Sequence, residues 1–87
     1  MSFATKLGGL IRKAGVTRYR LTEKTDLDGA YVHRLASGER DNPSRDIVIS
    51  LGMGLMALSE DITIHDVNDL LLSAEHAPLR KKHALLA

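Results

Sequence analysis

The side chains best able to do chemistry in this sequence are basic, and they are unevenly distributed. Residues 1–45 hold nine Lys and Arg against five Asp and Glu, residues 46–79 hold six acids and no Lys or Arg, and residues 80–87 add three cations. Such asymmetry is typical of proteins in which one part binds a polyanion, although solvated helix faces give the same pattern. The first half is therefore the candidate binding region.

The sequence shows no residue pattern typical of a catalytic or metal-binding site. There is no cysteine, which excludes disulfides, thiol catalysis and cysteine-ligated zinc. The histidines lack the helical His-x-x-x-His spacing of a metal-ligand pair, and Gly8-Gly9 precedes no phosphate-binding lysine pattern. We therefore expect no enzymatic activity, no metal and no cofactor. The four histidines are His33, His65, His76 and His83.

The length of 87 residues leaves room for one small domain, which we place at residues 1–79. The only aromatic residues are Phe3, Tyr19 and Tyr31, so its core must be aliphatic. No apolar run approaches the roughly 18 residues of a membrane span, which predicts a soluble, cytoplasmic protein. The basic tail at 80–87 is expected to reach phosphates, to bind a partner or to stay disordered.

Hydrophobic periodicity predicts three short helices in the first half. The first covers residues 3–14, a second runs from Thr17 to about Thr25, and a third covers residues 29–37. Capping and turn residues stand at the expected ends of these helices. They are Gly15, Thr17, Asp26, Asp28 and Gly38.

Two further helices are expected after a polar loop at 39–43. Ser44 caps the fourth, although Gly52 and Gly54 weaken that prediction because glycine disfavours helix. Thr63 begins the fifth and approximates a capping box with Asp66. The sequence therefore predicts an all-α, five-helix domain joined by short connections.

Two short helices joined by a turn of three or four residues, inside a small all-helical domain, suggest a helix-turn-helix. The ordered positions over roughly residues 3–79 resemble the phage-repressor and Cro-like helix-turn-helix family. The residues that carry this resemblance are Val16-Thr17-Arg18, Leu21, Leu27-Asp28, Tyr31-Val32, Arg34-Leu35, Gly38-Glu39-Arg40, the block from Ser44 to Leu55, Leu70-Leu71-Leu72-Ser73-Ala74 and Ala77-Pro78-Leu79. The resemblance implies a compact phage-repressor-like fold with the helix-turn-helix at helices two and three. It also implies a bacterial or phage transcriptional regulator that binds double-stranded DNA, with a recognition helix at about 28–37 in the major groove.

Four residues of the third helix match family positions that include those meeting base edges: Gly29, Ala30, His33 and Arg34. Arg34 can bond guanine O6 and N7 with its planar fork, and His33 can exchange a hydrogen bond with a base edge. Ala30 can touch a thymine methyl group, whereas Gly29 brings no side chain. Sequence selectivity would therefore rest chiefly on Arg34 and His33.

The resemblance also suggests contacts to DNA phosphates from Thr17, Arg18, Tyr31, Arg40 and Asn42. Arg18 stands where the family commonly has a glutamine that reaches the DNA backbone, and it adds a full charge. It can instead be a solvated residue, unfavourable beside the helix dipole. Tyr31 can instead pack between helices.

Arg34 and His33 also fit roles that do not involve DNA. Arg34 can pair with Glu23 or Glu39, and His33 can be a surface histidine without a partner. The whole chain can likewise be a protein-interaction or oligomerisation module that keeps this scaffold without using DNA. The weak net charge, the acidic second half and the side-chain-poor pair Gly29 and Ala30 favour that interpretation.

DNA-binding domains of this size usually act in pairs, because one helix-turn-helix buries little surface on DNA. We expect a homodimer through the last helix and its flank, with Leu72 and Leu79 as the contact residues. Leu72 can instead only widen the core stripe. A further protein partner is also compatible with the acidic half.

Overall fold

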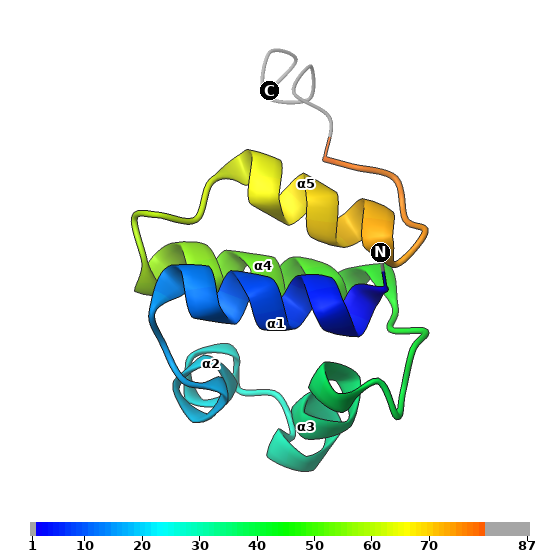
Figure 1. Ribbon diagram of the computed structural model, residues 1–87, viewed down its shortest axis with the longest axis horizontal. Coiled ribbons are helices and arrows are strands. Elements are labelled where there is room, and N and C mark those ends of the chain that lie inside the picture. The colour runs from blue at the N-terminus through cyan, green and yellow to red at the C-terminus, as the bar shows by residue number, and fades with distance from the viewer. Residues whose placement is uncertain (1, 80–87) are drawn as a thin grey trace.

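Five helices and short connections make up the structure, a computed structural model that describes residues 2–79 (Figure 1). The helices are α1 (Phe3–Ala14), α2 (Arg18–Thr25), α3 (Gly29–Ser37), α4 (Arg45–Leu58) and α5 (Ile64–Ser73). Within these residues there is no strand, and no helix is long and apolar enough to cross a membrane. The all-α prediction and its five helices are confirmed. The predicted tail at 80–87 lies outside the described residues.

Side-chain caps stand at the start of α2 and at the start of α3. The Thr17 hydroxyl accepts a hydrogen bond from the Arg20 N–H at 3.0 Å, and the Asp28 carboxylate accepts one from the Ala30 N–H at 3.0 Å. Between these caps Asp26 has φ 61°, in the left-handed region that ends a helix. The chain therefore turns over Asp26–Asp28 instead of continuing as one helix.

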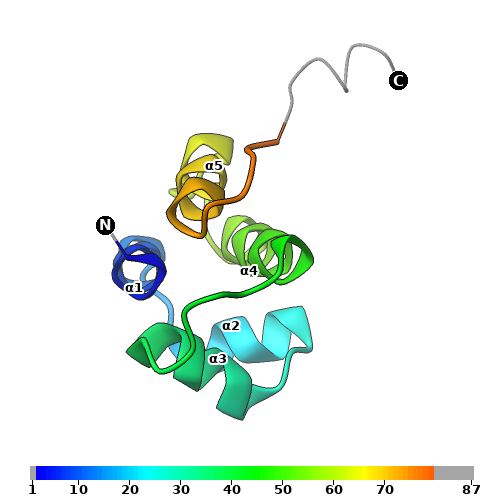
Figure 2. The same ribbon diagram turned by 90° about the vertical axis from the view of Figure 1, so that its right-hand side faces the viewer.

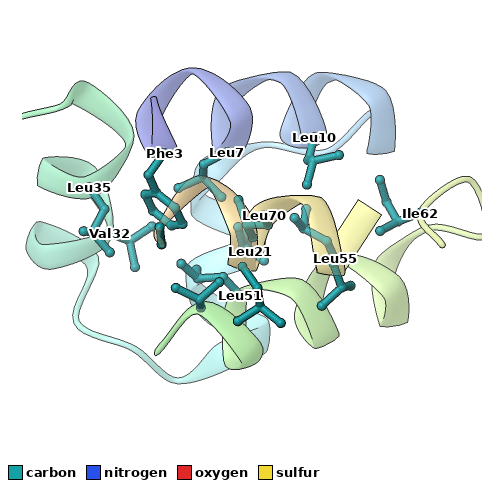
Figure 3. Close-up of a cluster of buried hydrophobic side chains, with 14 residues drawn as sticks. Phe3, Leu7, Leu10, Leu21, Val32, Leu35, Leu51, Leu55, Ile62 and Leu70 are labelled. Atoms are coloured by element: carbon teal, nitrogen blue, oxygen red, sulfur yellow. The ribbon is translucent and has the colours of Figure 1, made fainter. Parts of the chain in front are cut away.

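All five helices contribute to one aliphatic core. Figure 3 shows Leu7 of α1, Leu21 of α2 and Leu70 of α5 pointing into the same interior. These leucines are fully buried, and Phe3 is the only aromatic side chain among the buried core residues of the described chain. The remaining buried apolar residues are Leu10, Val32, Leu35, Val48, Leu51, Leu55, Ile62, Val67, Leu71 and Ala74.

Two glycines allow α4 to approach its neighbours closely. A Cβ atom at Gly52 would lie 2.7 Å from Val67 Cγ1 of α5, and one at Gly54 would lie 2.6 Å from Thr25 Cγ2 of α2. Both distances are too short for two non-bonded carbon atoms. A residue larger than glycine therefore fits at either position only if the neighbouring side chain moves. Gly52 and Gly54 weaken α4 as an isolated helix, but the close packing of α4 requires them. The same packing stabilises α4 as a helix.

The helices form a layered arrangement with two distinct ends. α4 packs on both α2 and α5, and α1 packs on both α3 and α5. In the two views α2 and α3 lie at one end and α5 at the other (Figures 1 and 2). The outer surface of α2 and α3 is therefore far from the acidic helix α5.

Candidate nucleic-acid interface

α3 carries the four predicted base-contacting residues on the side away from the core. Its two fully buried residues, Val32 and Leu35, face inward. At 100° per residue the predicted positions lie on the opposite side of the helix. Of these, Gly29, Ala30 and His33 are exposed and Arg34 is half-buried. The outer side of α3 is therefore nearly bare in its first turn and polar in its second.

The Arg34 side chain makes no ion pair with Glu23 or Glu39 in the described part of the chain. The ion pair considered for this residue is therefore not formed. Its guanidinium retains donors in a planar fork, which is the geometry that bidentate recognition of guanine requires. The contact itself stays a prediction.

The first turn of α3 is capped by a carboxylate. Asp28 Oδ1 accepts the Ala30 N–H, and a negative charge at this end stabilises the helix. The same charge would repel a phosphate brought to the free amides of α3. A phosphate beside α3 would therefore be bound more readily by neighbouring side chains than by the N-terminal backbone of the helix.

The start of α2 offers two neighbouring donors. Thr17 and Arg18 are both exposed. Because Thr17 Oγ1 accepts from Arg20, its hydroxyl hydrogen can still be donated to a phosphate. Arg18 forms no ion pair within residues 2–79, although a cation in the first turn is unfavourable to the helix dipole. No acidic partner in that part of the chain offsets this cost.

The loop after α3 carries Arg40 and Asn42, two other predicted phosphate-contacting residues, and lies beside the third, Tyr31 of α3. The Arg40 guanidinium carbon lies 5.8 Å from the centre of the Tyr31 ring, near the limit of a cation–π contact. The Tyr31 ring also packs partly against the core, in agreement with a packing role between helices. The Arg40 N–H donates to the Arg34 carbonyl at 3.1 Å, which ties the loop to α3. A surface hollow of about 340 Å³ is lined here by Tyr31, Glu39, Arg40, Asp41 and Asn42.

The charge over this surface is balanced. Residues 17–42 contain five Lys and Arg and five Asp and Glu. Lys6 and Lys13 add to the positive surplus of the first half, but they pair with Asp69 and Asp66 of α5 at 3.6 and 2.8 Å. The basic field expected from the sequence is therefore weaker in space. Binding to a polyanion would depend on individually placed arginines.

Two exposed side chains extend the surface beyond the predicted set. Tyr19, next to Arg18 on α2, is 70% exposed, and Ser37 is exposed one turn after His33 on α3. A tyrosine hydroxyl such as that of Tyr19 is a common donor to DNA phosphates, whereas the Ser37 hydroxyl already donates to the Arg34 carbonyl at 3.1 Å. Helical spacing from His33 would have identified Ser37. Tyr19 needed the structure, because an aromatic residue is equally expected in the core.

The predicted contact residues for a dimer differ in exposure. Leu72 is 56% exposed and lies outside the core, so the interpretation that it widens the core is wrong. Ile64, about two turns earlier on α5, is 42% exposed. Leu79 packs partly against the core, and its N–H donates to Asn68 Oδ1 at 2.9 Å. Leu72 and Ile64 are thus separate exposed apolar side chains of α5, and self-association stays a prediction.

Residues 2–79 contain no group of three His, Asp or Glu side chains placed to hold a metal ion. No family model, curated protein or solved structure matches the chain. The candidate interface therefore rests on the residues and geometry described above.

Proposed function

We propose that this chain is a DNA-binding transcriptional regulator of the phage-repressor and Cro-like helix-turn-helix type, with α2 and α3 as the motif. One observation carries this proposal: α3 turns a small and polar side outward, and arginines flank it at the start of α2 and in the following loop. A helix that enters the major groove needs a narrow outer side, and phosphate donors beside it set its register.

In this mechanism α3 enters the major groove. The bare first turn, Gly29 and Ala30, lets the helix backbone approach the base edges, and Ala30 can contact a thymine methyl group. Arg34 and His33 supply the hydrogen bonds that distinguish one base pair from another. Selectivity rests on these two side chains, so the operator should have few strongly specified positions in each half-site.

Phosphate contacts come from two sides of α3. Thr17 and Arg18 meet one stretch of the DNA backbone, and Arg40 and Asn42 meet another, with the Tyr31 ring beside Arg40. Two separated contacts fix both the position and the tilt of the helix. They carry no sequence information themselves.

Two copies would bind together. Leu72 of α5 is exposed and can pack on a second copy. A two-fold dimer that turns both α3 helices to the same side presents them to half-sites about 34 Å apart.

Binding to a labelled duplex at increasing salt tests this function. With three or four phosphate contacts per site, log K should fall against log salt with a slope of about −3 to −4. Arg18→Ala and Arg40→Ala should each make the slope shallower by about one for each copy bound, because each removes one cation per chain. Arg12→Ala removes the same charge from an exposed position on α1 and serves as the matched control. A slope near zero for the unmodified protein would contradict DNA binding.

A second function is a protein-interaction or oligomerisation module on the same scaffold. The observation that favours it is the balance of five cations and five acids over residues 17–42. Such a module would show no steep salt dependence with DNA, because it releases no counterions from phosphates. Absence of duplex binding even at low salt supports this second function.

A further inference from the structure

The segment that follows α5, residues 74–79, begins on the same side of the molecule as the loop between α3 and α4, at the right of Figure 1. His76 Nε2 lies 2.8 Å from the Pro43 carbonyl oxygen, and Arg45 Nε donates to the Ala77 carbonyl at 3.3 Å. Because a carbonyl oxygen only accepts, His76 Nε2 carries the hydrogen and donates it. The end of the described chain is thereby bonded to the end of the loop.

The hydrogen bond from His76 to Pro43 holds one end of residues 40–43, and a second hydrogen bond holds the other end. At the beginning of this stretch, the Arg40 N–H donates to the Arg34 carbonyl at 3.1 Å. At its end, Pro43 is fully buried and receives the bond from His76. Exposed Asn42 lies between the two anchors. The orientation of Arg40 and Asn42 therefore depends on both anchors together.

We propose that His76 is a positioning residue for the phosphate-contacting loop, and that its bond to Pro43 holds Arg40 and Asn42 in the orientation in which they meet DNA. This role rests on the proposed function, in which those two residues contact phosphates. A loop that is ordered before binding loses less conformational entropy when it binds. His76 acts through Pro43 and does not touch the DNA.

Four variants distinguish a positioning role of His76 from a general effect on the stability of the fold. His76→Ala removes the ring, and His76→Phe keeps its bulk without the donor. His76→Gln restores an amide donor at the Nε2 position. Asn68→Ala is the matched control, because it removes the bond to the Leu79 N–H in the same segment and leaves the loop bond intact.

The first measurement uses protein without DNA. In His76→Ala and His76→Phe, the amide hydrogen of Arg40 should exchange about two- to tenfold faster, the factor expected for one lost hydrogen bond. His76→Gln should exchange like the unmodified protein, and so should Asn68→Ala. Unchanged Arg40 exchange in both donor-less variants would overturn the positioning role.

The second measurement is duplex binding across salt. The two donor-less variants should bind about two- to tenfold more weakly on every sequence, with a salt slope shallower by about one for each copy bound, and His76→Gln should restore both. Faster exchange with unchanged affinity and slope would also overturn the role. If the unmodified protein binds no duplex, the proposed function fails, and Arg40 exchange alone decides whether His76 orders the loop.

Discussion

The Nζ atom of Lys13 lies 2.8 Å from Oδ2 of Asp66, and this pair ties the last turn of α1 to the first turn of α5. The same oxygen accepts the Thr63 N–H at 3.0 Å, which completes the predicted capping box. Burial alone would raise the pKa of Asp66. Hydrogen bonds from Lys13 and Thr63, with the Lys13 charge, outweigh it and lower the pKa below its ordinary 3.8.

Asp66→Asn should therefore lower stability in a pH-dependent way. A folded-state pKa below the unfolded value means that ionised Asp66 stabilises the fold above pH 3.8, and that this contribution is lost as the pH falls through the folded pKa. We expect the variant to lose about 1 kcal/mol of unfolding free energy at neutral pH and progressively less in acid. Urea unfolding over a pH series measures both.

The matched control for that prediction is Asp69→Asn. Asp69 pairs with Lys6 at 3.6 Å, but its side chain is 57% exposed and takes no part in the cap. Its loss should change the unfolding free energy by less than about 0.5 kcal/mol. An Asp66→Asn deficit that stays constant into acid would contradict the assignment of the lowered pKa to this ion pair and cap.

Gly52→Ala should destabilise the protein, although alanine is the better helix former. The added methyl group meets the fully buried Val67 at 2.7 Å, so we expect a loss of about 1–3 kcal/mol. Thermal or urea unfolding measures this loss of stability. Adding Val67→Ala to Gly52→Ala should remove the close contact, so the double variant should lose less than the sum of the two single variants.

Gly9→Ala is the control for the close approach. A Cβ atom there would meet nothing within 4 Å, so the substitution should stabilise α1 by about 1 kcal/mol. Equal stabilisation by both alanines would show that α4 does not pack as tightly as described.

Local sequence signals made the helix ends predictable. The contacts between helices could not be predicted in this way. The caps at Thr17, Asp28 and Thr63 act within three residues, so the sequence already places the helix ends. The pairing of Lys13 with Asp66 spans 53 residues and has no local signal. Charge counted along the sequence therefore overstated the positive surface, because it could not show which cations α5 neutralises.

The candidate site was predictable to the same degree. Helical spacing places His33 and Arg34 on the outer side of α3, and in the structure His33 is exposed. Helical spacing does not reveal that Arg34 is half-buried or that Arg40 lies over Tyr31, since both depend on how the loop returns to the helix.

Arg34→Ala should relax sequence preference at one base pair. Losing a bidentate contact to guanine should reduce discrimination there by about 1–3 kcal/mol and leave the other positions unchanged. Arg34→Lys keeps the charge without the planar fork, so it should lose the same discrimination. Competition binding with singly substituted duplexes measures both, and an equal loss on every duplex would contradict base reading by Arg34.

Leu72→Glu should prevent self-association without unfolding the protein, because Leu72 is exposed and outside the core. Sedimentation equilibrium is expected to show a dimer for the unmodified chain and a monomer for this variant. Met53→Glu is the control, since Met53 is 42% exposed but lies on α4. A dimer that survives Leu72→Glu would move the interface away from α5.

The most direct test of the central claim is selection of bound sequences from a pool of randomised duplexes across salt concentrations. DNA binding through α3 predicts enrichment of a two-fold-symmetric site, with half-sites about 34 Å apart and retention that falls steeply with salt. Arg34→Ala should lose one specified position from that site. Retention without an enriched sequence would contradict base reading by α3. No retention even at low salt would contradict DNA binding altogether and leave the interaction module as the function of this surface.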